Sequence, residues 1–317
     1  MSRRTWLLTC IAMLGGCAVD RGTDRVRDCA SCPEMVTIPA GVATLGALAA
    51  DGYRRPDELP RRTFVIRERF EVSRYEITRD EYAAFVRATG RAVEGHCLTD
   101  RDQRGNWVYD PATTFRDPGF AQAGNHPVAC VNWEDANAYV DWLNSRTDGG
   151  YRLLTEVEWE YIASAGAANS IYPWGDESRE GCSFANGFDQ TALAQYRGVD
   201  TSGYPVYDPL ACTDGWVHTM PVGSLAPNAF GIHDMIGNVS EWIADCHAKS
   251  HESVSADGSP PGVEGPCEKR VAKGGSWGTL SHNLRTAERF PYASAHRDDS
   301  IGIRVARSHP QRNRRKP

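Results

Sequence analysis

Three segments of the chain place apolar residues at the spacing of an α-helix. The first follows Thr78, where Tyr82, Phe85 and Val86 share one face. Glu81 stands three residues after Thr78, which is the spacing of a capping box: the hydroxyl accepts from the Glu81 amide and the carboxylate reaches back. The pattern therefore predicts a helix that begins directly after Thr78.

Two more helices are expected on the same grounds. One follows Asn132 and stops near Gly149. The other begins at Thr155, where Glu158 completes a second capping box, and ends near Gly166. Short apolar runs predict strands, and these runs lie at 34–41, 64–66 and 70–72.

The stretch from 170 to 231 has little periodicity and many turn residues. Loops of this length inside a compact domain usually need structural support, and bound metal or disulfides are the two supports that the sequence offers. There is no internal repeat and no linker after residue 34, so we expect one domain over 34–307.

The composition is that of a globular protein, with 41% hydrophobic and 24% charged residues among 317. The formal charge of −6 argues against nucleic acid as the main partner. The last residues, 308–317, form a basic tail. It is interpreted as a solvated end, with contact to a membrane surface as the alternative.

The N-terminus has the pattern of an export signal. Arg3 and Arg4 precede a short apolar stretch, and Gly15-Gly16-Cys17 resembles a lipoprotein box. Residues 1–16 are therefore predicted to be a signal peptide, exported by the Sec or the twin-arginine route. Cys17 is the predicted lipidation site, and 17–33 would be a tether. These features place the protein in the cell envelope, anchored to the membrane through its lipid.

Eight cysteines remain after Cys10 and Cys17, and an even number in an exported protein indicates disulfides. Nesting along the chain suggests a set of pairs, although six of these cysteines allow fifteen connectivities. The suggested pairs are Cys97 with Cys130, Cys182 with Cys212, Cys246 with Cys267, and Cys29 with Cys32. The last pair could also be a redox motif, although it lies in the tether.

Six motifs in a fixed order resemble the formylglycine-generating enzyme, or sulfatase-modifying factor, family. They are EMVTIPAG, FEVSRYEITRDEYAAFV, HPVACVNWEDANAYVDWLN, YRLLTEVEWEYIASAG with YPWGD, FGIHDMIGNVSEW, and VAKGGSW with GIRVAR. The resemblance implies an irregular α+β domain, distantly similar to C-type lectins, with little regular secondary structure.

The segment GIHDMIGNVSEW carries oxygen ligands of the kind that Ca²⁺ prefers. The resemblance implies one structural site with side-chain oxygens from Asp234 and Glu241 and backbone oxygens from Gly237 and Val239. It implies a second site formed by Asn186, Gly187, Asp214 and Trp216. The alternatives without a metal ion are a turn at Asp234 and an ordinary loop at Asn186.

The family's oxidases bind Cu(I) through two cysteines after the GGS motif, and those positions are Thr279 and Leu284 here. Neither a hydroxyl nor an alkyl group replaces a thiolate as a Cu(I) ligand, so copper is not expected. Ser276 matches the pocket serine of the family. Arg285 and Arg289 are further pocket candidates, which could hold a carboxylate or form structural salt bridges.

Three functions stay open at this point. The preferred one is an envelope lipoprotein that binds a peptide or protein partner, or modifies it without copper, as in the exported siderophore-maturing branch. The second is an active formylglycine-generating oxidase acting on a sulfatase cysteine, and the third is a structural component of an envelope assembly.

His247 and His251 have HxxxH spacing, but the Ser, Gly and Pro around them indicate a solvated loop.

Overall fold

A computed structural model describes residues 25–100, 105–166, 169–176, 178–196, 209–259 and 267–308. The predicted signal peptide, the lipidation site Cys17 and nearly all of the basic tail lie outside these residues. None of the described helices is long and apolar enough to cross a membrane.

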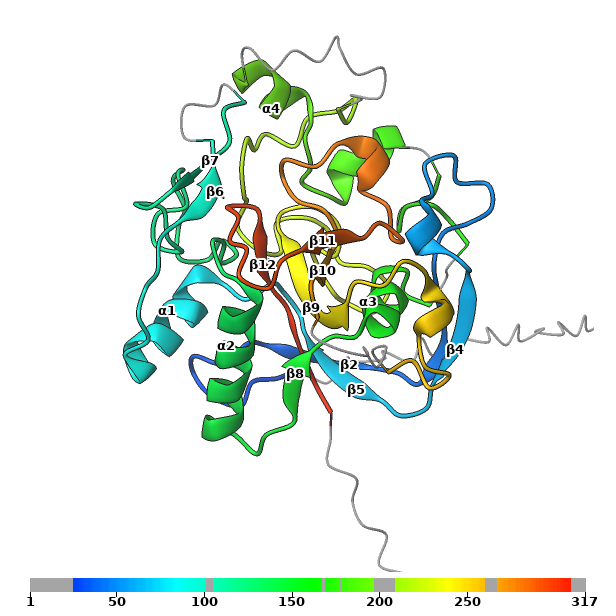
Figure 1. Ribbon diagram of the computed structural model, residues 1–317, viewed down its shortest axis with the longest axis horizontal. Coiled ribbons are helices and arrows are strands. Elements are labelled where there is room, and N and C mark those ends of the chain that lie inside the picture. Colours follow the sequence, from blue (N-terminus) through cyan, green and yellow to red (C-terminus); the bar gives the residue numbers. More distant parts are fainter. Residues whose placement is uncertain are drawn as a thin grey trace, which may run out of the picture.

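The main sheet has five strands and joins segments from both ends of the chain (Figure 1). Its central strands are buried, as their apolar composition requires, and β13 pairs antiparallel with both β5 and β8. In spatial order the strands are β1 (Arg25–Val26), β2 (Met35–Ile38), β5 (Phe70–Ser73), β13 (Val305–Arg307) and β8 (Tyr151–Leu153).

The second sheet has four strands and supports the candidate site. Its central strand β9 is buried except for the partly buried Ala244, and it pairs antiparallel with β10 and parallel with β12. The order is β11 (Phe290–Tyr292), β10 (Arg270–Lys273), β9 (Ser240–Cys246) and β12 (Ile301–Ile303). Two ribbons complete the strands: β3 (Gly41–Leu45) with β4 (Arg62–Ile66), and β6 (Cys97–Thr99) with β7 (Val108–Asp110).

The three predicted helices are present, the first and third with the expected capping boxes and the second with one that was not predicted. They are α1 (Arg79–Thr89), α2 (Trp133–Arg146) and α3 (Glu156–Ala163), and capping boxes start from Thr78, Asn132 and Thr155. Helices α1 and α2 lie side by side on one flank, and α3 lies on the other (Figure 1). A short helix, α4 (Gln190–Gln195), and four 3₁₀ turns, η1 (Pro56–Glu58), η2 (Ser178–Ser183), η3 (His251–Ser253) and η4 (Ser281–Asn283), lie in the long connections.

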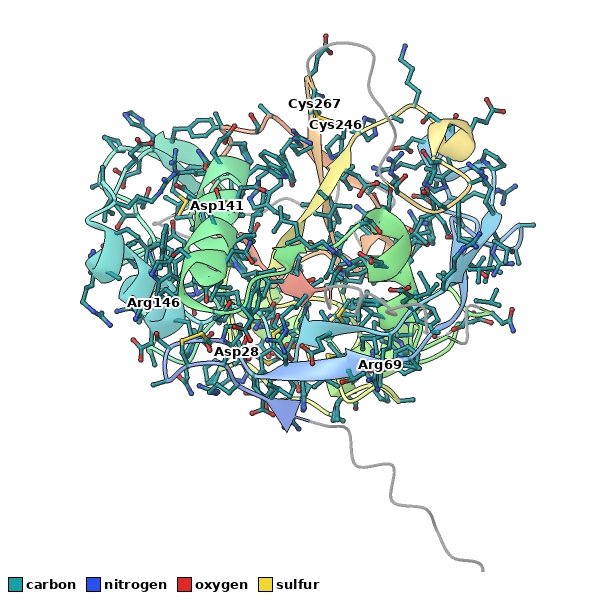
Figure 2. All side chains as sticks on the ribbon, turned by 90° about the horizontal axis from the view of Figure 1, so that it is seen from below. Asp28, Arg69, Asp141, Arg146, Cys246 and Cys267 are labelled. Atoms are coloured by element: carbon teal, nitrogen blue, oxygen red, sulfur yellow. A yellow bond between two sulfur atoms is a disulfide. The ribbon has the colours of Figure 1, made fainter. Side chains whose placement is uncertain are left out.

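The predicted disulfides are all present. They join Cys29 to Cys32, Cys97 to Cys130, Cys182 to Cys212 and Cys246 to Cys267. Figure 2 shows the last pair at one end of the molecule, where it closes the base of an insertion.

Two segments are more ordered than their composition suggested. Residues 25–33, which read as part of a tether, add β1 to the main sheet through Arg25–Val36 and Val26–Met35 pairs. The expectation of a solvated loop at His251 was wrong, because this side chain is fully buried. Its backbone N–H donates to the carbonyl of Leu59, and Arg62 donates to its carbonyl, so residues distant in sequence hold the turn in place.

Candidate functional site

The positions of the two missing cysteines meet after strand β10, where Gly275 takes a left-handed backbone conformation with φ 68°. A Cβ atom placed on Gly275 would lie 2.9 Å from Leu284 Cδ2 and 3.0 Å from Thr279 Cγ2. Glycine is therefore required for both its φ and its small size. Thr279 and Leu284, five positions apart in the chain, thus pack on the same backbone atoms.

Hydrocarbon and hydroxyl groups, not sulfur, occupy this place. Leu284 is fully buried and belongs to the main hydrophobic cluster. The Thr279 hydroxyl accepts from the backbone N–H of Ser276 at 2.9 Å and lies 3.2 Å from the Ser276 hydroxyl. The eight cysteines of the described chain are all in disulfides, and none of them lies between 268 and 308. This donor set does not fit Cu(I).

Aromatic side chains surround the residue after Ser276. Trp277 is buried, and the rings of Trp107, Phe120, Tyr196 and His218 contact it at centroid distances of 4.7 to 6.3 Å. Trp107 is the outermost of these rings, with 42% of its surface exposed. The substituted site is therefore bordered by an aromatic wall that reaches the molecular surface.

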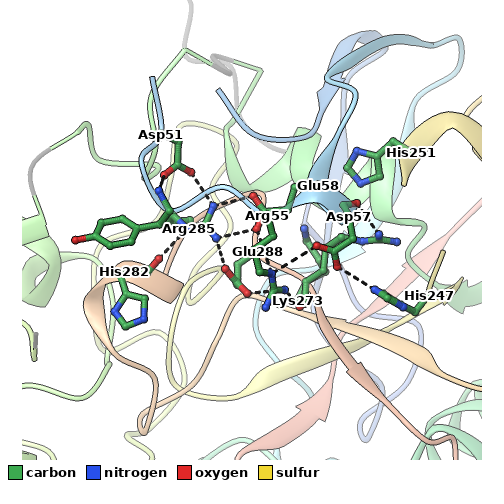
Figure 3. Close-up of polar contacts among 12 residues, drawn as sticks. Asp51, Arg55, Asp57, Glu58, His247, His251, Lys273, His282, Arg285 and Glu288 are labelled. Atoms are coloured by element: carbon green, nitrogen blue, oxygen red, sulfur yellow. Dashed lines mark hydrogen bonds and ion pairs between the residues drawn. The ribbon is translucent and has the colours of Figure 1, made fainter. Parts of the chain in front are cut away.

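Arg285 lies directly after Leu284, but its guanidinium group points into a buried ionic cluster (Figure 3). It donates to Asp51 at 2.7 Å and to both oxygens of Glu58 at 2.7 and 2.8 Å, and it also pairs with Glu288. Glu288 is bridged from its other side by Arg55 at 2.7 Å. Burial raises the pKa of Glu288 to about 7, although Arg285 and Arg55 lower it.

Arg289 is committed in the same way. Its Nε donates to Glu156 at 2.7 Å, and its Nη1 donates to the carbonyls of Asp57 and Ala248. Burial raises the pKa of Glu156. The neighbouring Arg289, His251 and Lys273 lower it by more than burial raises it, so the pKa lies below its usual range. The donors of both arginines are thus engaged by buried protein groups. Arg285 and Arg289 therefore form structural salt bridges, one of the two roles that the sequence left open for them.

Within the described residues, two buried oxygens of the second predicted calcium site have no hydrogen-bond partner. The side-chain amide of Asn186 donates to the carbonyl of His218, but its Oδ1 accepts nothing. Asp214 accepts from Trp216 through Oδ1, whereas its buried Oδ2 has no partner. Burial and the neighbouring Asp189 carboxylate raise the pKa of Asp214 to about 7. Two neighbouring acids that repel each other, and a buried amide oxygen in the same predicted ligand set, are the kinds of donor that a hard cation prefers.

At the first predicted calcium site, protein groups already donate hydrogen bonds to more of the side-chain oxygens than at the second. The oxygens of Glu241 accept from Arg304 Nε at 2.6 Å and from Trp159 Nε1 at 2.7 Å. Asp234 accepts from the Gly223 N–H at 2.6 Å, and its other oxygen, Oδ1, is buried without a partner. In the described residues no three His, Cys, Asp or Glu side chains converge as a metal site, so a cation here would depend on carbonyl oxygens.

Several residues of these sites were missed by the sequence reasoning. Asp189 is fully buried, caps α4 through the Thr191 and Ala192 amides, and accepts from the Asp214 N–H at 2.6 Å. Glu76 accepts from the Val239 N–H at 3.0 Å and from the Asn238 amide. Asp189 follows Phe188 at the start of a short helical segment, where an N-cap signal was available. Glu76 had no local signal.

The irregular two-sheet fold, the four disulfides and the GGS turn define a sulfatase-modifying-factor type of domain. The family described as "Sulfatase-modifying factor enzyme 1-like domain" matches residues 23–309, and the chain belongs to this family.

Its relatives differ in their stated activity. The chain is 31% identical to a formylglycine-generating enzyme of Thermomonospora curvata, over 77% of this chain and 82% of that protein. It is 26% identical to the mouse protein named inactive C-alpha-formylglycine-generating enzyme 2, over 96% of this chain and 91% of that protein. Among solved structures, it is similar to PvdO from Pseudomonas aeruginosa, with 33% identity and a TM-score of 0.72 over 90% of this chain and 98% of that chain.

Proposed function

We propose that this protein binds a peptide or protein partner in the cell envelope and does not carry out copper–cysteine oxidation. The observation that carries the proposal is Leu284, fully buried against Gly275 and Thr279 where the family's oxidases have a cysteine. Leucine carries no sulfur that could bind a metal ion. Its buried side chain also leaves no room for such an ion at this position. The aromatic wall beside Ser276 remains as a binding surface.

Copper binding and aldehyde formation test this proposal directly. Purified protein is incubated with Cu(I), oxygen and a Cys-x-Pro-x-Arg sulfatase peptide. We expect neither stoichiometric copper nor aldehyde from the natural sequence. The double variant Thr279→Cys with Leu284→Cys should gain Cu(I) binding, and each single variant serves as its control because one thiolate is not enough. Aldehyde formed by the natural sequence would establish the oxidase instead.

Calcium at the second site is part of the proposal. Asn186 and Asp214 would supply side-chain oxygens, and Gly187 and Trp216 backbone oxygens. This cation would order the long loop that contacts the site, since the Phe188 N–H donates to the Thr279 carbonyl at 2.9 Å. Elemental analysis of purified protein tests the assignment, and calcium without copper is the expected result.

Anchoring through Cys17 is tested by fractionation. A protein attached by lipid should sediment with membranes, whereas Cys17→Ser should move to the soluble fraction of the envelope. If the variant remained with the membranes, the lipid anchor would be wrong.

A further inference from the structure

Trp107 and the first two residues of strand β7 (Val108–Asp110) form a run of exposed apolar side chains. Trp107, Val108 and Tyr109 are exposed by 42%, 56% and 56%. No charged residue lies in 105–109. Natural edge strands are commonly protected by charge, proline or a bulge. In β7 (Val108–Asp110) the charged residue is the last one, Asp110, and Pro111 follows it, so this protection lies at one end and leaves Val108 and Tyr109 apolar and exposed.

The backbone of the same strand faces outward at Tyr109. The Leu98 N–H donates to the Arg297 carbonyl at 2.9 Å, and the Leu98 carbonyl accepts from the Asp299 N–H at 3.1 Å. Leu98 therefore directs its backbone groups away from β7. Tyr109 is its partner in the antiparallel register, and residues in such a non-bonded pair both face outward. In the described part of the chain, β7 pairs with β6 alone.

Side-chain contacts hold this edge beside the substituted site. The Trp107 ring stacks on Trp277 at 6.1 Å and 29°, and Trp277 follows Ser276 directly. The Tyr109 hydroxyl lies 3.0 Å from His296 Nδ1, and His296 stacks on Tyr292 at 4.5 Å. The ribbon is thus tied at two points to the C-terminal block that carries Thr279 and Leu284.

We propose that the outer edge of β7 binds an extended segment of the partner polypeptide as a third strand of the β6–β7 ribbon. This inference rests on the proposed binding function and gives it a location. An outward-facing N–H and C=O in an edge strand are matched by another strand, and neither a helix nor a lipid offers that pattern. Because side chains alternate along a strand, Trp107 and Tyr109 on one face favour a segment with apolar residues at every second position.

Two substitutions at one position separate backbone recognition from side-chain contact. Tyr109→Pro removes the outward N–H, and an edge strand tolerates proline where the N–H faces solvent. Tyr109→Ala removes the ring and the His296 contact but keeps the N–H. The probe is a phage-displayed library of random extended peptides selected on the full mature chain, and thermal melts check that both variants fold. If Tyr109→Pro fails to fold, Tyr109→Lys is used, since an edge lysine also blocks strand addition.

We expect the selected peptides to bind the Tyr109→Ala variant with moderate loss and the Tyr109→Pro variant at least about tenfold more weakly than the natural sequence, the scale of one lost hydrogen bond. Hydrogen exchange should slow at the Tyr109 amide when peptide binds. Peptides that bind Tyr109→Pro as well as the natural sequence would overturn the edge but leave the proposed function intact. Failure to select any peptide would reject both. A dimer that Tyr109→Pro dissociates would show that a second copy of this chain covers the edge, and would overturn the choice of partner.

Discussion

Residues 276–284 and residues 285–289 are neighbours in the chain, but they place very different side chains in the interior of the protein. In residues 276–284, Ser276 and Thr279 are hydrogen-bonded to each other and Leu284 is buried in the hydrophobic core, whereas in residues 285–289, Arg285 and Arg289 are held by buried carboxylates. Strongly polar residues beside a family's reaction site need not take part in chemistry. Here the charged half is scaffold, because its donors are already bound, and the uncharged half is where the family's reaction would take place.

The largest effect is expected from breaking the charged half. Arg285→Met would leave Asp51, Glu58 and Glu288 buried without the guanidinium group that bridges them. Removing one partner of a buried ion pair costs about 3–5 kcal/mol. Denaturant unfolding measures this loss, and the exposed Arg69→Ala is the matched control. Equal stability in the two variants would mean that the cluster is not part of the scaffold.

The next effect tests whether the neutral half is a core. Leu284→Ala should lower the free energy of unfolding by about 3 kcal/mol, because a buried leucine leaves a cavity. Leu284→Met keeps the volume and should cost less than about 1.5 kcal/mol. A stable Leu284→Ala variant would indicate an open pocket here, which would weaken the comparison of the two halves.

Calcium should stabilise the loop next to the neutral half. With free Ca²⁺ at about one hundred times Kd, binding to the folded state adds about 2.7 kcal/mol. The chelator EDTA should therefore lower the Tm of the natural sequence and leave an Asn186→Ala, Asp214→Ala double variant unchanged. A Tm that does not respond to chelation or to added calcium would reject the second site.

The last effect concerns pH and is measured at Glu288 in the charged half. Because the pKa of Glu288 is raised to about 7 in the folded protein, the folded state binds this proton more tightly than the unfolded state. Its contribution to stability is present at low pH and is lost as the pH rises from about 4.5 to about 7. Glu288→Gln should remove this component, whose slope is at most about 1.4 kcal/mol per pH unit.

The difference in unfolding free energy between the natural sequence and Glu288→Gln, followed across this pH range, measures the effect. Exposed Glu134→Gln should show no such trend. Parallel pH profiles for the natural sequence and Glu288→Gln would contradict the assignment.

Local sequence signals were reliable where the interaction itself is local. The capping boxes at Thr78 and Thr155 join residues three positions apart, and nesting of the cysteines was enough to suggest the observed disulfides. The GGS motif likewise located Ser276 and the two substituted cysteine positions, Thr279 and Leu284, by resemblance. In the capping boxes, chain connectivity alone brings the groups close together, whereas the disulfides join cysteines 33 and 30 residues apart and depend on the fold.

Burial of charge was decided by the tertiary structure. Arg285 meets Asp51 and Glu58 across more than two hundred residues, and His251 is buried by a turn that packs on Leu59. The outward backbone of Tyr109 depends on which way Leu98 turns toward Arg297. No periodicity records such pairings, because they arise only when distant segments compete for the same hydrogen-bonding groups. The residue types alone settled the absence of sulfur at positions 279 and 284, since no fold can supply a thiolate from threonine or leucine.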